Sequence, residues 1–108
     1  MGSSGGARGV WGYVQGGMGG LSQALASAAR ERGVAIRTDA SVERITLQDG
    51  KAAGVQLAGG EMIAARTVAS CLDANQTFLR LVGESHLPDG FARAVERIDY
   101  SSASLKIN

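Results

Sequence analysis

The chain has 108 residues and a net charge of +1, so it forms at most one domain and lacks a strong field that would attract nucleic acid or an anionic membrane. Its single cysteine, Cys71, excludes an internal disulfide, and together with the single histidine, His86, it offers no set of metal-ligand spacing. No run approaches the roughly 20 apolar residues of a membrane span, so the sequence predicts a soluble, cytoplasmic protein with no metal, nucleic-acid partner or integral membrane segment.

The first regular element is a helix over residues 20–32. Its apolar residues recur at helical spacing and form one narrow stripe of mostly small side chains: Leu21, Ala24, Leu25 and Ala28. Arg30 and Arg32 suit the negative end of the helix dipole, and Gly33 can adopt the left-handed conformation that ends a helix.

Short strands follow this helix. Residues 34–38 are predicted to form one strand, and residues 67–71, apolar without alternation, a second one covered on both faces that joins the same sheet. Between them the sequence predicts a three-stranded meander with turns at Asp49–Gly50 and Gly59–Gly60. Its strands are expected over residues 41–48, 52–58 and 61–65.

The last third of the chain predicts two helices. Asp73 can cap a helix over 74–82, and Pro88 precedes a second helix over 89–98. The final "LKIN" resembles the start of a strand that has no partner in the chain, which suggests a piece of a larger protein. The predicted fold class is therefore α/β, or more narrowly an α+β fragment: helix, strand, β-meander, strand and two helices.

The glycine-rich run before the first helix allows two interpretations. Gly17, Gly19 and Ser22 match the spacing of a dinucleotide fingerprint, and Asp39 follows at about the distance of a ribose-binding acid. However, the preceding "VWGYVQ" is too polar for a central parallel strand. The alternative is a tight entry into a helix that lies close to a backbone or a ligand.

Several blocks make the sequence similar to a known family. "RGVWGYVQGGMGGLSQALASAA", "VERI", "GVQL", "TVASC", "TFLRLVG" and "KIN" resemble the phytoene desaturase-like FAD-dependent oxidoreductases from about Arg8 to Asn108. The resemblance implies part of a FAD/NAD(P)-binding Rossmann-like domain in which the strands at 34–38 and 67–71 are parallel. It also implies that the true glycine fingerprint lies far upstream, so that residues 13–39 do not hold a dinucleotide phosphate. The implied organisation is a flexible segment 1–9, a second part of the FAD domain over 10–72, and the start of a helical or substrate-domain segment over 73–108.

The resemblance implies three positions near FAD. Val42 matches a valine whose backbone meets the adenine in related amine oxidases, although an ordinary inward-facing strand valine explains it equally well. Ser70 and Cys71 match a small pair at the end of the following strand, where the chain passes close to the cofactor. Cys71 stands where asparagine is usual, so a buried structural thiol is the simpler reading of its side chain.

The resulting functional hypothesis is a fragment of a FAD-dependent oxidoreductase that dehydrogenates or desaturates an unidentified, apolar small molecule. The fragment is expected to be inactive alone, its catalytic residues are unknown, and a homo-oligomer is possible. The alternative is a free-standing α+β module that binds a partner through the edge of its meander and carries no cofactor.

Overall fold

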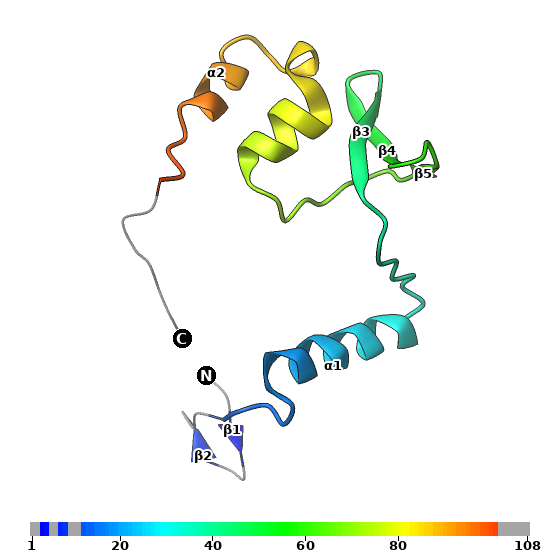
Figure 1. The fold of residues 1–108 in the computed structure, drawn as a ribbon, viewed down its shortest axis with the longest axis vertical. Helices are drawn as coiled ribbons and strands as arrows, with labels where there is room; N and C mark the ends of the chain where they lie inside the picture. The colour runs from blue at the N-terminus through cyan, green and yellow to red at the C-terminus, as the bar shows by residue number, and fades with distance from the viewer. Residues whose placement is uncertain (1–2, 5–6, 9–11, 102–108) are drawn as a thin grey trace. The chain divides into compact units, whose positions relative to one another are not determined.

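The structure is a computed structural model that describes residues 3–4, 7–8 and 12–101 (Figure 1). The chain divides into two compact units, Met1–Thr38 and Asp39–Asn108, which are described separately below. The predicted flexible segment 1–9, Trp11 and the terminal "LKIN" lie wholly or largely outside the described residues. No helix in the described part of the chain is long and apolar enough to span a membrane.

The first unit contains a short antiparallel pair, β1 (Ser3–Ser4) and β2 (Ala7–Arg8), and the helix α1 (Gly17–Glu31). The helix predicted over 20–32 is therefore confirmed, with a start three residues earlier. At its C-terminus the amides of Gly33 and Val34 donate to the carbonyls of Arg30 and Ala29, and Gly33 is left-handed, as predicted. None of the side chains of α1 is buried.

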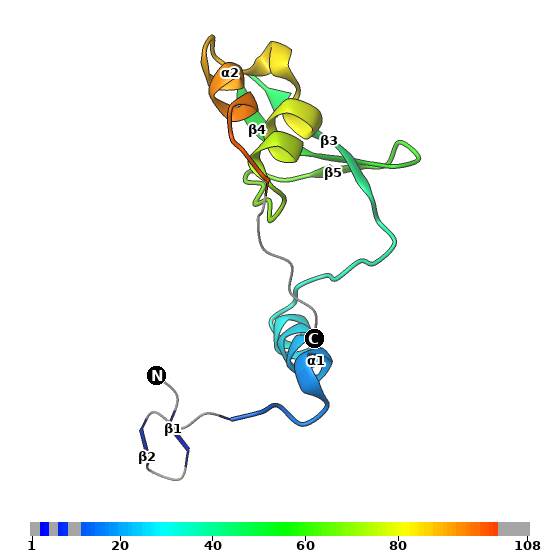
Figure 2. The same ribbon diagram turned by 60° about the vertical axis from the view of Figure 1, so that its left-hand side comes forward.

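The second unit is built on a three-stranded antiparallel sheet in the order β3-β4-β5 (Figure 2). Its strands are β3 (Val42–Gln48), β4 (Lys51–Leu57) and β5 (Met62–Ala64), so the predicted meander is confirmed. Asp49 and Gly50 connect the first two strands with φ values of 51° and 72°, the left-handed pair that a tight hairpin turn requires. The register changes after Thr46, where Gly54 passes so close to the Ile63 carbonyl that a side chain would not fit.

The two strands predicted on either side of the meander do not form in the described residues. Residues 34–38 and 67–71 are extended or irregular but pair with no other strand, and Val34 and Ile36 are 51% and 41% exposed. A parallel strand exists only by pairing with a neighbour that runs the same way, and β3, β4 and β5 pair antiparallel with one another. The small α+β architecture is shown, whereas the parallel Rossmann arrangement is not confirmed.

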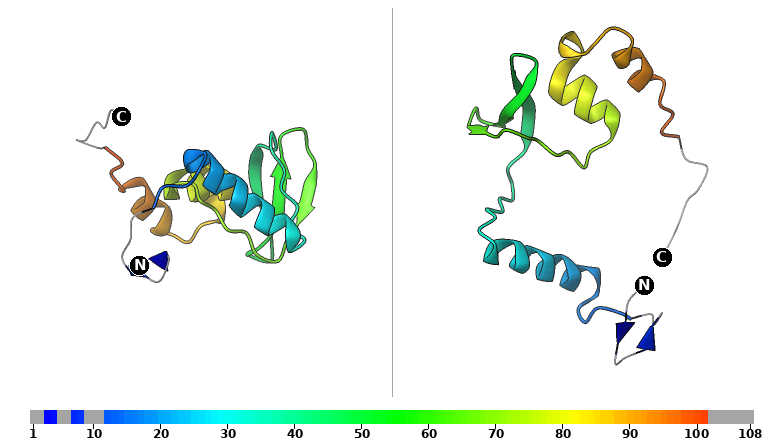
Figure 3. Two further views of the ribbon diagram at one scale, coloured as in Figure 1. Left: turned by 90° about the horizontal axis from the view of Figure 1, so that it is seen from below. Right: turned by 180° about the vertical axis from the view of Figure 1, so that it is seen from behind.

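Helices follow the sheet (Figure 3). The helix expected over 74–82 is η1 (Asn75–Gly83), which is a π-helix rather than an α-helix; the 3₁₀ turn η2 (Glu84–His86) comes next. The helix expected over 89–98 is shorter, α2 (Phe91–Glu96). Packing of η1 against β3 and of α2 against η1 gives this unit its core, whose buried apolar residues are Ile45, Leu57, Leu81 and Val95.

Candidate functional site

A corner of the chain at Ser70–Leu72 lies between the sheet and the start of η1, and a hydrogen-bonded pair of hydroxyl groups holds it. Ser70 Oγ lies 2.8 Å from Thr77 Oγ1, and the Leu72 amide donates to Ser70 Oγ at 3.2 Å. Thr77 is the only buried polar side chain in the described part of the chain, at 9% exposure. The corner is therefore attached to η1 by side chains as well as by the chain itself.

The three residues expected near FAD come together at this corner. Val42, Ser70 and Cys71 line one pocket of about 220 Å³ between β3, β4, η1 and the corner. Its other lining residues are apolar: Ile45, Val55, Val68, Ala69, Leu72 and Leu81. A second apolar pocket of about 410 Å³ shares Ile45, Val68, Ser70 and Leu72 with it, so the two form one groove along the sheet and η1.

Cys71 has a free thiol and is exposed, so the reading of this residue as a buried structural thiol is wrong in the described structure. Burial of position 71 would need a neighbour on its open side, and the described residues place none there. Cys71 lines the same pocket as Ser70, whose hydroxyl is already engaged with Thr77.

The N-terminus of η1 is capped as the sequence predicts. The Gln76 amide donates to Asp73 Oδ1 at 2.8 Å, and the Gln76 side chain donates to Asp73 Oδ2 at 2.9 Å. The hydrogen bond from the Gln76 amide, followed by that from its side chain, lowers the pKa of Asp73 below its ordinary value of 3.8. The Asn75 amide donates to the hydroxyl of Tyr100 at 3.3 Å, so this helix end has little capacity left for an anion.

The glycine run before α1 does not have the geometry of a dinucleotide fingerprint. Gly17 and Gly19 lie inside the first turn of α1, residues 12–14 form no strand, and none follows the helix at 34–38. Gly16 is left-handed and caps the helix, while Gly20 passes so close to the Gln15 carbonyl that a side chain would collide with it. The alternative reading, a tight entry into a helix close to backbone, fits this segment.

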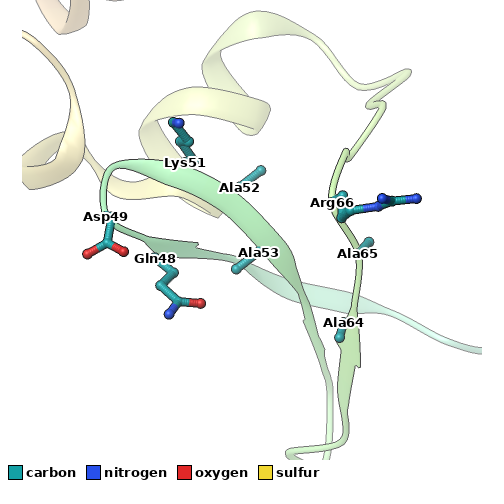
Figure 4. A pocket seen from close by; sticks show the side chains of 8 residues that line it. All are labelled: Gln48, Asp49, Lys51, Ala52, Ala53, Ala64, Ala65 and Arg66. Atoms are coloured by element: carbon teal, nitrogen blue, oxygen red, sulfur yellow. The ribbon is translucent and has the colours of Figure 1, made fainter.

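A further pocket of about 730 Å³ lies at the end of the sheet (Figure 4). Four of the residues that line it are alanines, namely Ala52, Ala53, Ala64 and Ala65. The ends of Asp49, Lys51 and Arg66 point in different directions in Figure 4 and do not converge on a common point. No group of three metal-ligating side chains gathers among the residues that the structure describes, and His86 is exposed in η2.

Two residues with a structural role at this corner were missed by sequence reasoning, Thr77 and Tyr100. Thr77 carried a usable signal, because it lies four residues after a helix-capping Asp73 and within one helical turn of the apolar Phe78 and Leu81. Tyr100 carried no such signal, because its contact with Asn75 joins residues 25 positions apart.

The corner fits part of a flavin nucleotide. A flat aromatic ring requires an apolar wall with small residues at the point of closest approach, and the Val42–Cys71 pocket offers both. A pyrophosphate requires several free backbone amides, which the corner and the capped end of η1 do not offer. The residues therefore suit a ring and leave the phosphates to another part of the site.

Comparison with known proteins is consistent with this chemistry. The profile of the family described as flavin containing amine oxidoreductase matches residues 1–105. The mouse pyridine nucleotide-disulfide oxidoreductase domain-containing protein 2 is 43% identical over the whole chain and 19% of its own length. The 4,4'-diapolycopene oxygenase of a Methylomonas species is 36% identical over 93% of the chain and 19% of its own length. The hydroxyneurosporene desaturase of Rubrivivax gelatinosus is 42% identical over 70% of the chain and 14% of its own length.

The chain belongs to the flavin-containing amine oxidoreductase family. It spans about a fifth of the length of the first two of these relatives. FAD is the cofactor of a complete protein of this family. No solved structure matches the chain.

Proposed function

We propose that the chain is part of a longer FAD-dependent oxidoreductase that dehydrogenates an apolar small molecule. The family match over residues 1–105 supports the flavin, and relatives named as an oxygenase and a desaturase support oxidation as the reaction class. The bound flavin supplies the redox chemistry, and the protein supplies position and polarity. The same match disfavours the alternative hypothesis of a free-standing interaction module, because that hypothesis predicts no flavoprotein relatives.

The role of this chain is to form one wall of the FAD site at Val42, Ser70 and Cys71. The observation that carries this proposal is that residues 28 positions apart in the sequence, Val42 and Ser70, line one apolar pocket together with Cys71. Val42 begins β3 and Ser70 begins the corner, so a flat ring placed here would contact a strand edge on one side and small side chains on the other.

The longer protein also explains the two extended segments that form no strand in the described residues. Residues 34–38 and 67–71 have the composition of strands, and Val34 and Ile36 are exposed apolar side chains. We place both segments in a parallel sheet whose other strands belong to the longer protein, because such a sheet would cover these apolar side chains. In that arrangement the end of segment 67–71 lies where open α/β sheets bind their ligands.

Substitution of Cys71 in the longer protein tests the wall. Cys71→Ala and Cys71→Asn keep a small side chain and should leave the ratio of flavin to protein absorbance nearly unchanged. Cys71→Trp should lower that ratio strongly without unfolding the protein, because overpacking a tight site costs about 1–3 kcal/mol, or roughly tenfold in affinity. A circular-dichroism melt of each variant controls for folding. Full flavin occupancy in a folded Cys71→Trp protein would show that the corner does not contact the cofactor.

A further inference from the structure

We propose that Thr77 is a positioning residue for the flavin pocket: it fixes the Ser70–Leu72 corner, so that Cys71 and the backbone of the corner, not the Ser70 hydroxyl, face the cofactor. This inference rests on the function proposed above. It gives a structural role to the "TFL" segment, whose Thr77 lies on η1. Thr77 lines the adjoining 410 Å³ pocket but not the 220 Å³ pocket of Val42 and Cys71.

The hydrogen bonds at the corner form a closed cycle. The Leu72 amide donates to Ser70 Oγ, which lies 2.8 Å from Thr77 Oγ1. Thr77 Oγ1 in turn donates to the carbonyl of Leu72 at 3.5 Å. Each hydroxyl has one hydrogen to donate. With the Thr77 hydrogen directed to Leu72, the Ser70 hydrogen is directed to Thr77. The Ser70 hydroxyl then has no hydrogen left to donate to a ligand.

Thr77 is itself held firmly enough to serve as the fixed end of this cycle. Its side chain is buried, and its amide donates to the Asp73 carbonyl at 2.9 Å. Leu81, one turn further along η1, is buried among the core residues and lines the same pocket as Cys71. The corner, by contrast, pairs with no strand and would be free to shift without the hydroxyl pair.

The experiment measures FAD affinity in the longer protein by reconstitution of the apoprotein, for the wild type, Thr77→Val and Thr77→Ser. Thr77→Val keeps the shape of the side chain and removes its hydroxyl, so that the Ser70 hydroxyl loses its partner. FAD should bind about tenfold more weakly to this variant. Thr77→Ser retains the hydroxyl and should restore most of the affinity. An unchanged affinity in Thr77→Val would overturn the proposal.

A matched variant separates positioning from general stability. Val95 is buried on α2 and lines neither pocket of the groove, so Val95→Ala should lower the melting temperature but leave FAD affinity unchanged. An equal loss of FAD affinity in Val95→Ala and Thr77→Val would overturn the positioning role.

The Ser70→Ala variant, alone and combined with Thr77→Val, tests which group faces the cofactor. Ser70→Ala alone also tests the hydroxyl pair if the Thr77→Val protein does not fold. Both single changes remove the Ser70–Thr77 hydrogen bond, and each also removes one further bond of the cycle, so the double variant should lose clearly less affinity than the sum of the two single losses. Fully additive losses would mean that Ser70 and Thr77 act independently on FAD binding, which contradicts the proposal. If the Cys71→Trp protein keeps its flavin, the proposal that the corner forms a wall of the FAD site is wrong. If the Cys71→Trp protein loses flavin while the Thr77→Val protein keeps it, only the proposed role of Thr77 is wrong.

Discussion

The rings of Phe78 and Phe91 meet edge to face, with centroids 5.0 Å apart and planes at 87° to each other. Phe78 lies on η1 and Phe91 begins α2, so this pair joins two helices that the 3₁₀ turn and a loop separate. The edge of one ring carries a partial positive charge and the face of the other a partial negative charge, which favours this arrangement. The pair therefore joins the start of α2 to η1.

Replacing Phe91 with leucine should weaken the attachment of α2 while keeping an apolar side chain. The aromatic pair contributes about 0.5–1.5 kcal/mol beyond the area it buries, so Phe91→Leu should lower the free energy of unfolding by about that amount. Chemical denaturation of the longer protein measures the change. Phe91 is 39% exposed, so a loss far above this range would show that more than the ring contact depends on it.

The cap at Asp73 predicts a dependence of stability on acid. Its carboxylate accepts two hydrogen bonds from Gln76, and its pKa lies below the ordinary value of 3.8. A carboxyl group with a lowered pKa in the folded state stabilises the fold above its unfolded-state pKa, and this contribution is lost as the pH falls through the folded-state value. The free energy of unfolding should therefore be insensitive to this group near neutral pH and fall below about pH 4.

Two substitutions isolate this effect. Asp73→Asn keeps an oxygen acceptor for the Gln76 amide but cannot titrate, whereas Asp73→Ala removes the cap at every pH. The pKa of Asp99 is also lowered, by the backbone and then the side-chain hydrogen bond of Ser101, so the total acid dependence has a second source. The informative quantity is thus the difference between wild type and Asp73→Asn. A difference that does not change between pH 6 and pH 3 would contradict the assignment to Asp73.

The loss of stability caused by glycine-to-alanine changes should depend on the backbone conformation and the free space at each glycine. Gly54 has a φ of 152° and no room for a side chain beside the Ile63 carbonyl, so Gly54→Ala should be the most damaging. Gly60 has open space but a φ of 91°, and its replacement should cost about 1–2 kcal/mol. Gly19 lies in α1 with open space, and Gly19→Ala should stabilise the helix by up to about 1 kcal/mol. Thermal melts of the three variants test the order, and a Gly54→Ala protein as stable as Gly60→Ala would refute it.

The 108-residue chain alone should bind FAD weakly. Its corner can receive a ring, but the start of η1 has its first amides engaged with Tyr100 and Asp73, so the described end of this helix cannot hold a pyrophosphate. Titration with FAD, followed by flavin fluorescence, should show no quenching in the low micromolar range. Strong quenching there would indicate that the chain contains a phosphate site of its own.

The isolated chain should also associate with itself. Several apolar side chains are exposed in each unit, among them Met18 and Leu25 of α1 and Met62 of β5, and the outer edges of β3 and β5 offer unpaired backbone groups. Size-exclusion chromatography across a dilution series should therefore show an apparent mass that falls on dilution. A sharp monomer at every concentration, with cooperative unfolding, would argue against this prediction.

The sequence predicted the elements whose signals are local. Asp49–Gly50 between two alternating runs indicated a hairpin, and Asp73 before an apolar run indicated a helix start; both are confirmed. It did not predict the π-helical pattern of η1, because π-helices are rare and an apolar run of nine residues is too short to separate them from α-helices. It also could not show that residues 34–38 and 67–71 would form no strand in the described structure, because strand pairing depends on partners elsewhere.

The candidate site likewise combines features that the sequence predicted with features that only the fold reveals. Val42, Ser70 and Cys71 came from the resemblance to flavoproteins, and their common pocket is a property of the fold that no local pattern contains. Their contact with FAD stays a prediction. The helical spacing could have placed Thr77 near the apolar side of its helix, but not its hydrogen bond to Ser70, because periodicity does not reveal the course of the segment that holds Ser70.

The hydroxyl pair of Ser70 and Thr77 has a consequence for the order of folding. The two residues are seven positions apart, so the loop that their hydrogen bond closes is short and its entropic cost is small. Contacts of such low sequence separation form within microseconds, long before strands from distant parts of a chain can pair. The corner can therefore take its shape during synthesis, as soon as η1 leaves the ribosome and before strands from distant parts of the chain have paired.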